Sequence, residues 1–218
     1  MKTDLFDYEL PENLIAATPA AQRDHSRLLV IERSSRRLTH TSFHEIGRFL
    51  PSSSRIFRNN AAVLKARLRG KREGGGAAEC LLLHPGSGEN TFWCLLKPGK
   101  RLREGATIEF ETHDQRAFGR VIEKNEAGHA LVQFTSPDGH SVTEIAERFG
   151  ELPLPPYIEK RRAEAEPGTN YKALDEDRYQ TRYADPKRKV AAAAPTAGLH
   201  FSDSLIEALQ AEHTFHNI

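Results

Sequence analysis

The stretch from residue 61 to residue 139 constrains the fold most, because short apolar runs alternate there with glycine-containing turns. Runs of this length and spacing are typical of antiparallel strands that close into a small barrel or stack as a sandwich. We therefore predict a β-rich module in the middle of the chain. The runs are Ala78–Leu83, Thr91–Leu96, Thr107–Phe110, Ala117–Ile122 and Ala130–Phe134.

Helix and strand signals mix on both sides of this module. Before it, Leu28–Ile31 has the composition of a buried strand, and Ser42 and Glu45 have the spacing of a capping box. After it, Ser141 and Glu144 form a second capping box. The combination favours a mixed α/β domain interrupted by an inserted antiparallel β-barrel domain. We place the first part of the α/β domain at residues 1–60, the barrel at 61–150 and the second part of the α/β domain at 151–218.

Two more signals follow the second capping box. Gly150 suits the C′ position, where many helices end in the left-handed conformation that glycine tolerates. Tyr179 and Tyr183 have the spacing of neighbours on one face of a helix. These signals predict one helix that ends before Gly150 and a short one that includes both tyrosines.

The composition excludes several classes of protein. With 31 Lys and Arg against 30 Asp and Glu, the net charge of +1 singles out no partner, and no apolar run approaches the ~20 residues that span a bilayer. The acidic start, Met1–Glu9, lacks the apolar region of a signal peptide. Two cysteines, Cys80 and Cys94, are too few for a disulfide framework and are predicted to be buried thiols. We therefore expect a cytoplasmic protein without a membrane partner.

Basic residues alternate with aliphatic ones at the start of the β module. Leu64, Ala66 and Leu68 occupy one face of an extended strand, and cations occupy the other. A row of cations can follow a phosphate backbone, although a solvated strand face has the same pattern. A second basic cluster lies in a later turn, so RNA is a candidate partner. These two clusters contain Lys65, Arg67, Arg69 and Lys71, and Lys97, Lys100, Arg101 and Arg103, and a third cluster contains Lys187, Arg188 and Lys189.

A run of small residues, Val190–Ala194, leads into the turn Pro195–Gly198 and then into a predicted helix. Ser202 or Ser204 can cap this helix. Small side chains let a ligand approach the backbone, and the free N–H groups at a helix start give a positive potential. His200 adds a group that exchanges protons near neutral pH. The same pattern also fits an ordinary strand–turn–helix connection with a buried histidine.

Several familiar sites are absent from the sequence. Gly74–Gly76 and Gly86–Gly88 do not complete a dinucleotide-binding fingerprint, and Pro98–Arg101 lacks residues that a P-loop needs. No nucleophile elbow appears, and His213 with His216 is too little for a zinc site. These absences argue against hydride transfer, P-loop hydrolysis and zinc chemistry.

A series of motifs runs along the whole chain. The motifs are Phe6–Pro11, Arg23–Asp24 with Ser26–Val30, Ala66–Leu68, Leu96–Leu102, Glu151–Ile158, Asp177–Thr181 and Ala193–Phe201. In this order they resemble the S-adenosylmethionine:tRNA ribosyltransferase-isomerase family of queuosine biosynthesis. The last three motifs carry most of the resemblance, because they are the most specific.

The resemblance implies an α/β domain interrupted by a β-barrel, in agreement with the segmentation above. It also implies that the ribosyl moiety of S-adenosylmethionine is transferred to 7-aminomethyl-7-deazaguanine at the tRNA wobble position and isomerised. Epoxyqueuosine forms, and adenine and methionine are released. S-adenosylmethionine would be a co-substrate and tRNA carrying the deazaguanine precursor the partner, with no true cofactor and no metal. We expect a monomer.

The resemblance also implies roles for individual residues. His200 is the candidate catalytic acid or base. Arg27 would hold a phosphate or carboxylate, with a structural ion pair as the alternative. Tyr179, Gln180 and Tyr183 would stack on or hydrogen-bond a base, with core packing as the alternative for the tyrosines. The adenosylmethionine pocket would be lined by Pro195, Thr196, Ala197, Gly198 and Leu199, and tRNA would be guided by Lys65, Arg67, Arg69, Lys97, Lys100 and Arg101.

The chain departs from the family pattern in two places. Family members carry Asn-Asp-Thr before the basic strand, where this chain has Asn59–Ala61, so only Asn59 carries over as a substrate-binding candidate. Family members also continue beyond the position of Ile218, so we expect this chain to lack their C-terminal part. Two alternatives therefore stay open: a non-catalytic RNA-binding relative, and an S-adenosylmethionine-binding protein without activity on tRNA.

Overall fold

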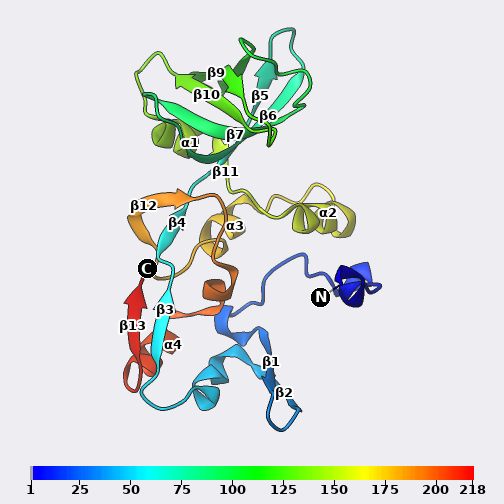
Figure 1. The fold of residues 1–218 in the computed structure, drawn as a ribbon, viewed down its shortest axis with the longest axis vertical. Helices are drawn as coiled ribbons and strands as arrows, with labels where there is room; N and C mark the ends of the chain where they lie inside the picture. Colours follow the sequence, from blue (N-terminus) through cyan, green and yellow to red (C-terminus); the bar gives the residue numbers. More distant parts are fainter. Residues whose placement is uncertain (1) are drawn as a thin grey trace. The chain divides into compact units, whose positions relative to one another are not determined.

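The computed structural model describes the backbone of residues 2–218, and all of their side chains except those of Val190 and Ala191. The chain forms two compact units (Figure 1). Unit 1 consists of the chain up to Arg55, Leu154–Arg178 and His200–Thr214. Unit 2 consists of Ile56–Pro153, Tyr179–Leu199 and Phe215–Ile218. Both units are therefore assembled from segments that are distant in sequence.

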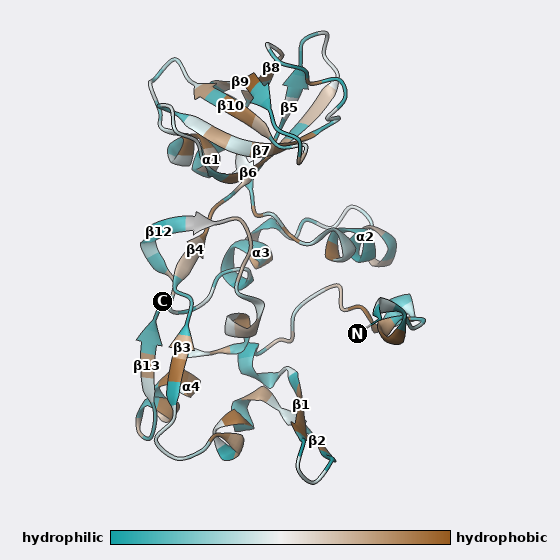
Figure 2. Ribbon diagram, viewed as in Figure 1, coloured by the Kyte–Doolittle hydropathy of each residue, from teal (hydrophilic) through white to brown (hydrophobic). Residues whose placement is uncertain are grey.

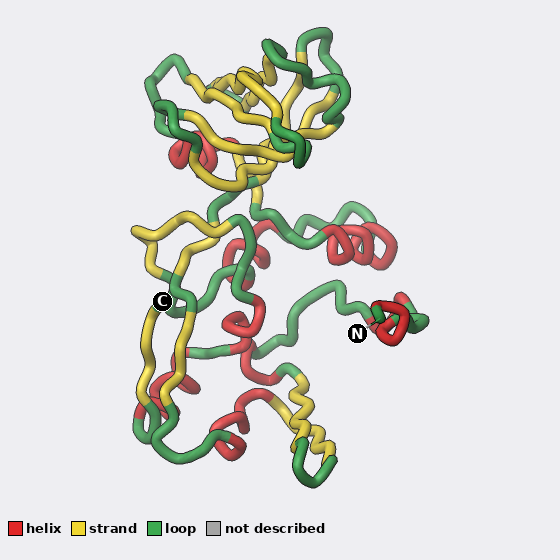
Figure 3. Tube along the Cα trace, in the orientation of Figure 1, coloured by secondary structure: helices red, strands yellow, loops and turns green. Residues whose placement is uncertain are grey.

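Six strands of unit 2 close into an antiparallel barrel (Figures 1 and 3). They follow the order β5–β6–β7–β10–β9–β8, and β8 pairs again with β5. The closed barrel confirms the fold predicted for the middle of the chain, while the domain boundaries given above stay a prediction. The strands are β5 (Arg67–Arg72), β6 (Ala77–Pro85), β7 (Thr91–Lys97), β8 (Thr107–Glu111), β9 (Arg116–Lys124) and β10 (Ala130–Thr135).

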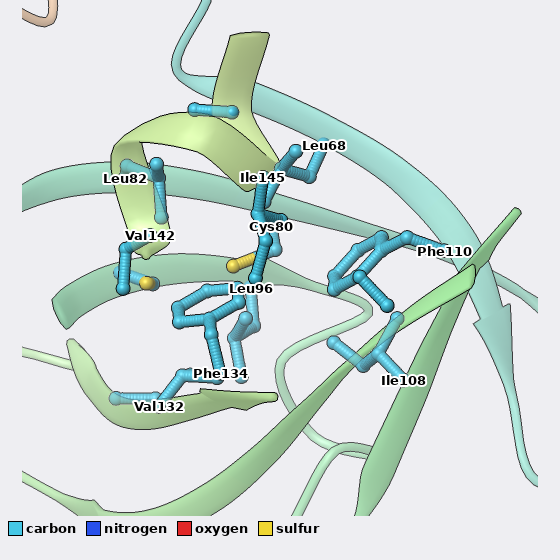
Figure 4. Packing of buried hydrophobic residues seen from close by; sticks show 14 of the residues in the cluster. Leu68, Cys80, Leu82, Leu96, Ile108, Phe110, Val132, Phe134, Val142 and Ile145 are labelled. Atoms are coloured by element: carbon cyan, nitrogen blue, oxygen red, sulfur yellow. The ribbon is translucent and has the colours of Figure 1, made fainter. Parts of the chain in front are cut away.

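Alternation of side chains along the strands fills the barrel. Every second residue points inward, so Leu68, Phe110 and Phe134 are fully buried (Figure 4). Apolar and polar residues are accordingly interspersed along the barrel strands in Figure 2. Cys80 and Cys94 are free, buried thiols of this core, as predicted, and burial raises the pKa of the Cys94 thiol. The core of unit 2 therefore follows directly from the period-two pattern.

Helix α1 (Val142–Phe149) adds Val142 and Ile145 to the barrel core. Its N-terminus has the predicted capping box. The hydroxyl of Ser141 accepts a hydrogen bond from the N–H of Glu144, and the carboxylate of Glu144 accepts one from the N–H of Ser141 at 2.8 Å. The box satisfies N–H groups that the first helical turn leaves without partners.

The helix ends before Gly150 as predicted, but the predicted reason for a glycine at this position is wrong. Its φ of −91° is not left-handed, so no glycine cap of that kind forms. Gly150 instead begins the short strand β11 (Gly150–Glu151), which pairs with β5. A Cβ on Gly150 would lie 2.0 Å from the carbonyl oxygen of Lys65 and 2.4 Å from that of Ala146. Glycine is needed here because backbone segments meet closely, which the local sequence does not encode.

Short parallel ladders complete the α/β part of the fold. β4 (Ala61–Val63) pairs in parallel with β12 (Asp185–Ala191). β3 (Arg55–Arg58) pairs with β13 (Thr214–Asn217), and the backbone hydrogen bonds at the two ends of this pair show that both strands run in the same direction. Parallel strands together with helices confirm the predicted mixed α/β class.

Unit 1 contains helices and one hairpin, in which β1 (Arg27–Glu32) pairs with β2 (Arg37–Ser42). None of the helices in the described part of the chain is long and apolar enough to cross a membrane. The α-helices of the unit are α2 (Pro156–Ala165), α3 (Lys172–Arg178) and α4 (Asp203–Gln210). The 3₁₀ helices are η1 (Thr3–Phe6), η2 (Glu12–Leu14), η3 (Arg23–His25) and η4 (Phe43–Phe49), and η5 (Thr196–His200) spans the passage from unit 2 to unit 1.

Two predictions for the hairpin region are wrong. Leu28–Ile31 lies in β1, but Leu29 and Ile31 are 48% and 60% exposed. Among the described residues β1 pairs with β2 alone, so the strand is not enclosed by a sheet. Ser42 makes no capping bond, and the Glu45 carboxylate accepts hydrogen bonds from Thr41 and Arg48 instead.

The helix predicted around the two tyrosines is also misplaced. Helix α3 ends at Arg178, so Tyr179 and Tyr183 both lie beyond it. They belong to unit 2, whereas α3 belongs to unit 1. The spacing of four residues is therefore not a helical contact in this chain.

Candidate active site

His200 lies at the C-terminal end of η5, where two side chains of unit 1 hold its ring. The hydroxyl oxygen of Ser26 lies 2.8 Å from Nδ1. The ring of Phe43 packs against the imidazole with the ring centres 5.2 Å apart, and Phe43 in turn meets Phe201 edge-on. His200 is half-buried. Its Nδ1 is thus occupied, whereas no described residue forms a hydrogen bond to its Nε2.

The hairpin explains why Ser26 and Phe43 meet at this ring. Arg27 and Ser42 are the outermost aligned pair of β1 and β2, so Ser26 and Phe43 are the next residues beyond the ladder. The N–H of Phe43 donates to the carbonyl of Ser26 at 2.9 Å. The open end of the hairpin therefore presents a hydroxyl and an aromatic ring to the same imidazole.

A second side-chain contact joins the same two segments. The hydroxyl of Ser202 donates to the carboxylate of Asp24 and accepts from the N–H of Leu205, which caps α4 as predicted. Asp24–Ser202 and Ser26–His200 are paired so that residues 24–26 and 200–202 run in opposite directions. The hydrogen bond from Ser202 lowers the pKa of Asp24 most, so this carboxylate is charged at neutral pH.

The segment before Ser26 is anchored on α3. The guanidinium of Arg23 donates to the carbonyl of Asp177 at 2.9 Å. The guanidinium of Arg178 donates to two carbonyl groups of the segment just before η3. Two motifs of the sequence, around residues 23 and 177, are therefore joined by hydrogen bonds just before Ser26.

The surroundings of His200 keep its imidazole neutral. Burial lowers the pKa of His200 most, and the positive charge of Arg23 lowers it further. The ring is therefore uncharged at neutral pH and carries one proton. Such a ring can accept a proton or donate a hydrogen bond to a substrate, depending on which nitrogen holds that proton.

The turn before His200 meets a tyrosine of unit 2. A Cβ on Gly198 would lie 2.1 Å from the hydroxyl oxygen of Tyr183 and 2.9 Å from Cγ2 of Thr181, so a larger residue would displace these side chains. The N–H of Gly198 donates to the carbonyl of Pro195 at 2.8 Å, which stabilises the turn. Of the predicted pocket residues, Thr196 and Ala197 are exposed, Pro195 and Leu199 are half-buried, and Gly198 is buried.

The residues predicted to contact a base have partners within unit 2. Oε1 of Gln180 accepts a hydrogen bond from the N–H of Val63 at 3.1 Å, and Tyr179 is buried. The guanidinium of Arg58 lies 4.6 Å from the centre of the Tyr183 ring, and burial raises the pKa of Tyr183. The burial of Tyr179 agrees with the alternative of core packing, while base contacts for all three residues stay a prediction.

Asn59 and Asn60, which stand where family members carry Asn-Asp, both accept hydrogen bonds. Oδ1 of Asn59 accepts from the N–H of Ala61 at 2.8 Å. Asn60 is buried, and its Oδ1 accepts from the guanidinium of Arg188 at 2.6 Å. The uncharged side chain of Asn60 therefore accepts a hydrogen bond from a cation. Arg27 is exposed and forms no ion pair with a described residue, and substrate binding by Asn59 and Arg27 stays a prediction.

The cations predicted to guide tRNA differ in their surroundings. Arg67 is only 6% exposed, so the prediction that it belongs to an open cationic face is wrong. Glu79 on the neighbouring strand β6 also lies beside these cations, since its carboxylate is 3.4–3.8 Å from the cationic nitrogens of Arg67, Arg69 and Lys97. The pattern within one strand cannot show a carboxylate on the next. Lys100 and Arg101 are exposed, and Lys65 is half-buried.

Sequence reasoning missed two residues of these sites. Ser26 lies inside a motif, but nothing in the sequence shows that it meets His200. Arg58 directly precedes Asn59, and its contact with Tyr183 is equally hidden. Both residues lie inside or directly beside a motif, and this is the feature of the sequence that could have pointed to them. The described residues contain no group of three or more His, Cys, Asp or Glu side chains that could hold a metal, and the absence of a metal stays a prediction.

Comparison with known proteins identifies the family of this chain. The family described as queuosine biosynthesis protein matches residues 3–218. A protein of Synechococcus sp. (strain CC9311), named S-adenosylmethionine:tRNA ribosyltransferase-isomerase, is 41% identical over 211 residues, covering 94% of this chain and 54% of that protein. The crystal structure of S-adenosylmethionine tRNA ribosyltransferase from Thermotoga maritima is 26% identical, with a TM-score of 0.35, over 97% of this chain and 56% of that one.

The chain therefore spans about half the length of this curated relative. The motifs that converge on His200 lie within the part that is shared. Because the family match extends over almost the whole chain, this protein belongs to the queuosine biosynthesis protein family.

Proposed function

We propose that this protein transfers and isomerises the ribosyl moiety of S-adenosylmethionine onto 7-aminomethyl-7-deazaguanine at the tRNA wobble position. The products would be epoxyqueuosine, adenine and methionine. The observation that carries the proposal is the half-buried, neutral His200, held by Ser26 and Phe43 at the end of a small-residue turn. Family membership supports the class of reaction. S-adenosylmethionine is the co-substrate, and the proposal includes no metal or true cofactor.

The chemistry of the proposed reaction calls for a residue of this kind. The sulfonium of S-adenosylmethionine acidifies the neighbouring 5′-methylene, and adenine must leave with a negative charge on its departing nitrogen. A positioned proton donor or acceptor lowers the barrier for either step. A half-buried ring suits this purpose, because hydrogen bonds are stronger where water is partly excluded.

Release of adenine tests the proposal. The chain is incubated with S-adenosylmethionine and tRNA that carries 7-aminomethyl-7-deazaguanine, and free adenine is measured by chromatography. Adenine is expected only when both substrates are present. Tight tRNA binding without adenine would overturn the enzyme proposal in favour of a non-catalytic RNA-binding relative. Adenosylmethionine binding without tRNA affinity would favour a small-molecule-binding protein.

The tRNA part of the proposal rests on the exposed cations of the barrel. Lys100 and Arg101 lie in the turn that follows β7, and no described carboxylate pairs with them. Two exposed cations in one turn can contact phosphates and release counterions, whereas Arg67 and Lys97 are already close to Glu79. The turn is therefore the part of the predicted cationic surface that we expect to bind tRNA.

Replacing Lys100 and Arg101 together with alanine is expected to weaken tRNA binding uniformly across tRNA sequences. Each lost phosphate contact reduces the slope of log affinity against log salt by about 1. Binding is measured by filter retention at several salt concentrations. The matched control is Arg120→Ala, which removes an exposed cation from β9 of the same barrel. An unchanged salt slope in the double variant would show that the turn does not contact tRNA.

A further inference from the structure

Ser26 makes a hydrogen bond whose direction the proposed function leaves open. Its hydroxyl lies 2.8 Å from Nδ1 of His200, and its carbonyl accepts the N–H of Phe43. The backbone of Ser26 is thus fixed by the hairpin, while the hydroxyl makes one hydrogen bond among the described residues. Among the described residues, the imidazole of His200 is therefore the single hydrogen-bond partner of this hydroxyl.

The two possible directions of this hydrogen bond leave a different proton without a partner. The neutral ring of His200 carries one proton, and a serine hydroxyl carries another. If Nδ1–H donated to Ser26, the hydroxyl proton would have no acceptor among the described residues. If Ser26 donates to Nδ1 instead, the hydroxyl proton is paired and the ring proton lies on Nε2, the nitrogen to which no described residue forms a hydrogen bond and which is therefore left for a substrate.

We propose that Ser26 is the positioning residue of His200, donating its hydroxyl proton to Nδ1 so that Nε2–H faces the substrate as a hydrogen-bond donor. This inference rests on the proposed function for the identity of the substrate. It assigns His200 to the departing adenine, whose developing negative charge accepts the Nε2–H bond. Abstraction of the 5′-methylene proton then falls to another group, because a protonated Nε2 cannot accept it.

The other groups around the ring agree with this assignment. Arg23 places a positive charge near His200, which disfavours the imidazolium. The carboxylate of Asp24 is engaged by Ser202 and by His25, so it does not turn toward the ring. Phe43 contributes an apolar face. An uncharged serine is the partner that keeps the ring neutral, since a carboxylate at position 26 would raise the pKa of His200 instead.

The sign of one pKa change tests the inference. Histidine ring ¹⁵N signals are followed by NMR against pH in the wild type and in Ser26→Ala, and the His200 signal is identified by its loss in His200→Gln. A donor to Nδ1 stabilises the neutral ring, so its removal is expected to raise the pKa of His200. Ser26→Thr keeps a hydroxyl and is expected to restore the wild-type value. A pKa that falls or stays unchanged in Ser26→Ala would overturn the inference.

A kinetic measurement accompanies the titration. Ser26→Ala is expected to lower kcat for adenine release by about fivefold to tenfold with little change in KM, because one hydrogen bond that orients His200 is lost. The matched control is Ser34→Ala, an exposed serine in the turn of the same hairpin, and it is expected to behave as wild type. If the wild type releases no adenine, the proposed function fails, while the titration still decides whether Ser26 donates to His200.

Discussion

The His200→Ala variant is expected to release adenine about 10² to 10⁴ times more slowly than the wild type, because this is the usual contribution of a positioned proton donor or acceptor. Binding of tRNA should be nearly unchanged, since the exposed cations of the barrel are untouched. Single-turnover adenine release and tRNA retention on filters measure the two quantities separately.

A matched histidine variant shows whether the loss is specific. His113 is exposed in a loop between β8 and β9, and His113→Ala is expected to keep wild-type rates. Adenine release by His200→Ala at the wild-type rate would remove this residue from the mechanism. A parallel loss of tRNA binding would instead indicate that the substitution disturbs the fold.

The Gly150→Ala variant is expected to destabilise the barrel by about 3 kcal/mol, the upper end of the usual cost of overpacking. The new methyl group would lie 2.0 Å and 2.4 Å from two carbonyl oxygens. Both oxygens belong to backbone, one in the chain leading to β5 and one in α1, so neither can move without disturbing a strand or a helix. For a chain of this size the melting temperature should fall by roughly 6–12 °C.

Trp93 reports this loss from within the barrel. It is the single tryptophan of the chain and lies on β7, so its fluorescence follows unfolding of unit 2. The control is Gly128→Ala, where nothing lies within 4 Å but φ is +80°, and the expected cost is about 1–2 kcal/mol of backbone strain. If both variants melt at the same temperature, crowding at Gly150 is not what makes glycine necessary there.

The barrel shows how far the sequence alone could be interpreted. The period-two runs place Leu68, Phe110 and Phe134 inside, and the structure buries all three. Such runs are reliable because the alternation is a local property of an extended strand. The capping box at Ser141 succeeds for the same reason, since its two hydrogen bonds join residues three apart.

The failures share a different cause. The cation pattern of β5 was correct, but Glu79 on β6 neutralises part of it. Ser42 and Glu45 have the spacing of a capping box, yet Thr41 and Arg48 take the Glu45 carboxylate. In each case a neighbour competes for the same group, and the spacing within one motif does not reveal it.

The local patterns of the sequence were enough to predict the barrel core and the mixed α/β class, while the role of the segment that ends at His200 stays a prediction. The tertiary structure alone decided what surrounds that histidine. Ser26 reaches it because the hairpin places residues 26 and 43 side by side. Gly150 must be glycine because distant backbone segments meet there. The physical reason is that periodicity and capping act over a few residues, whereas hydrogen bonds and close contacts depend on which distant segments the fold brings together.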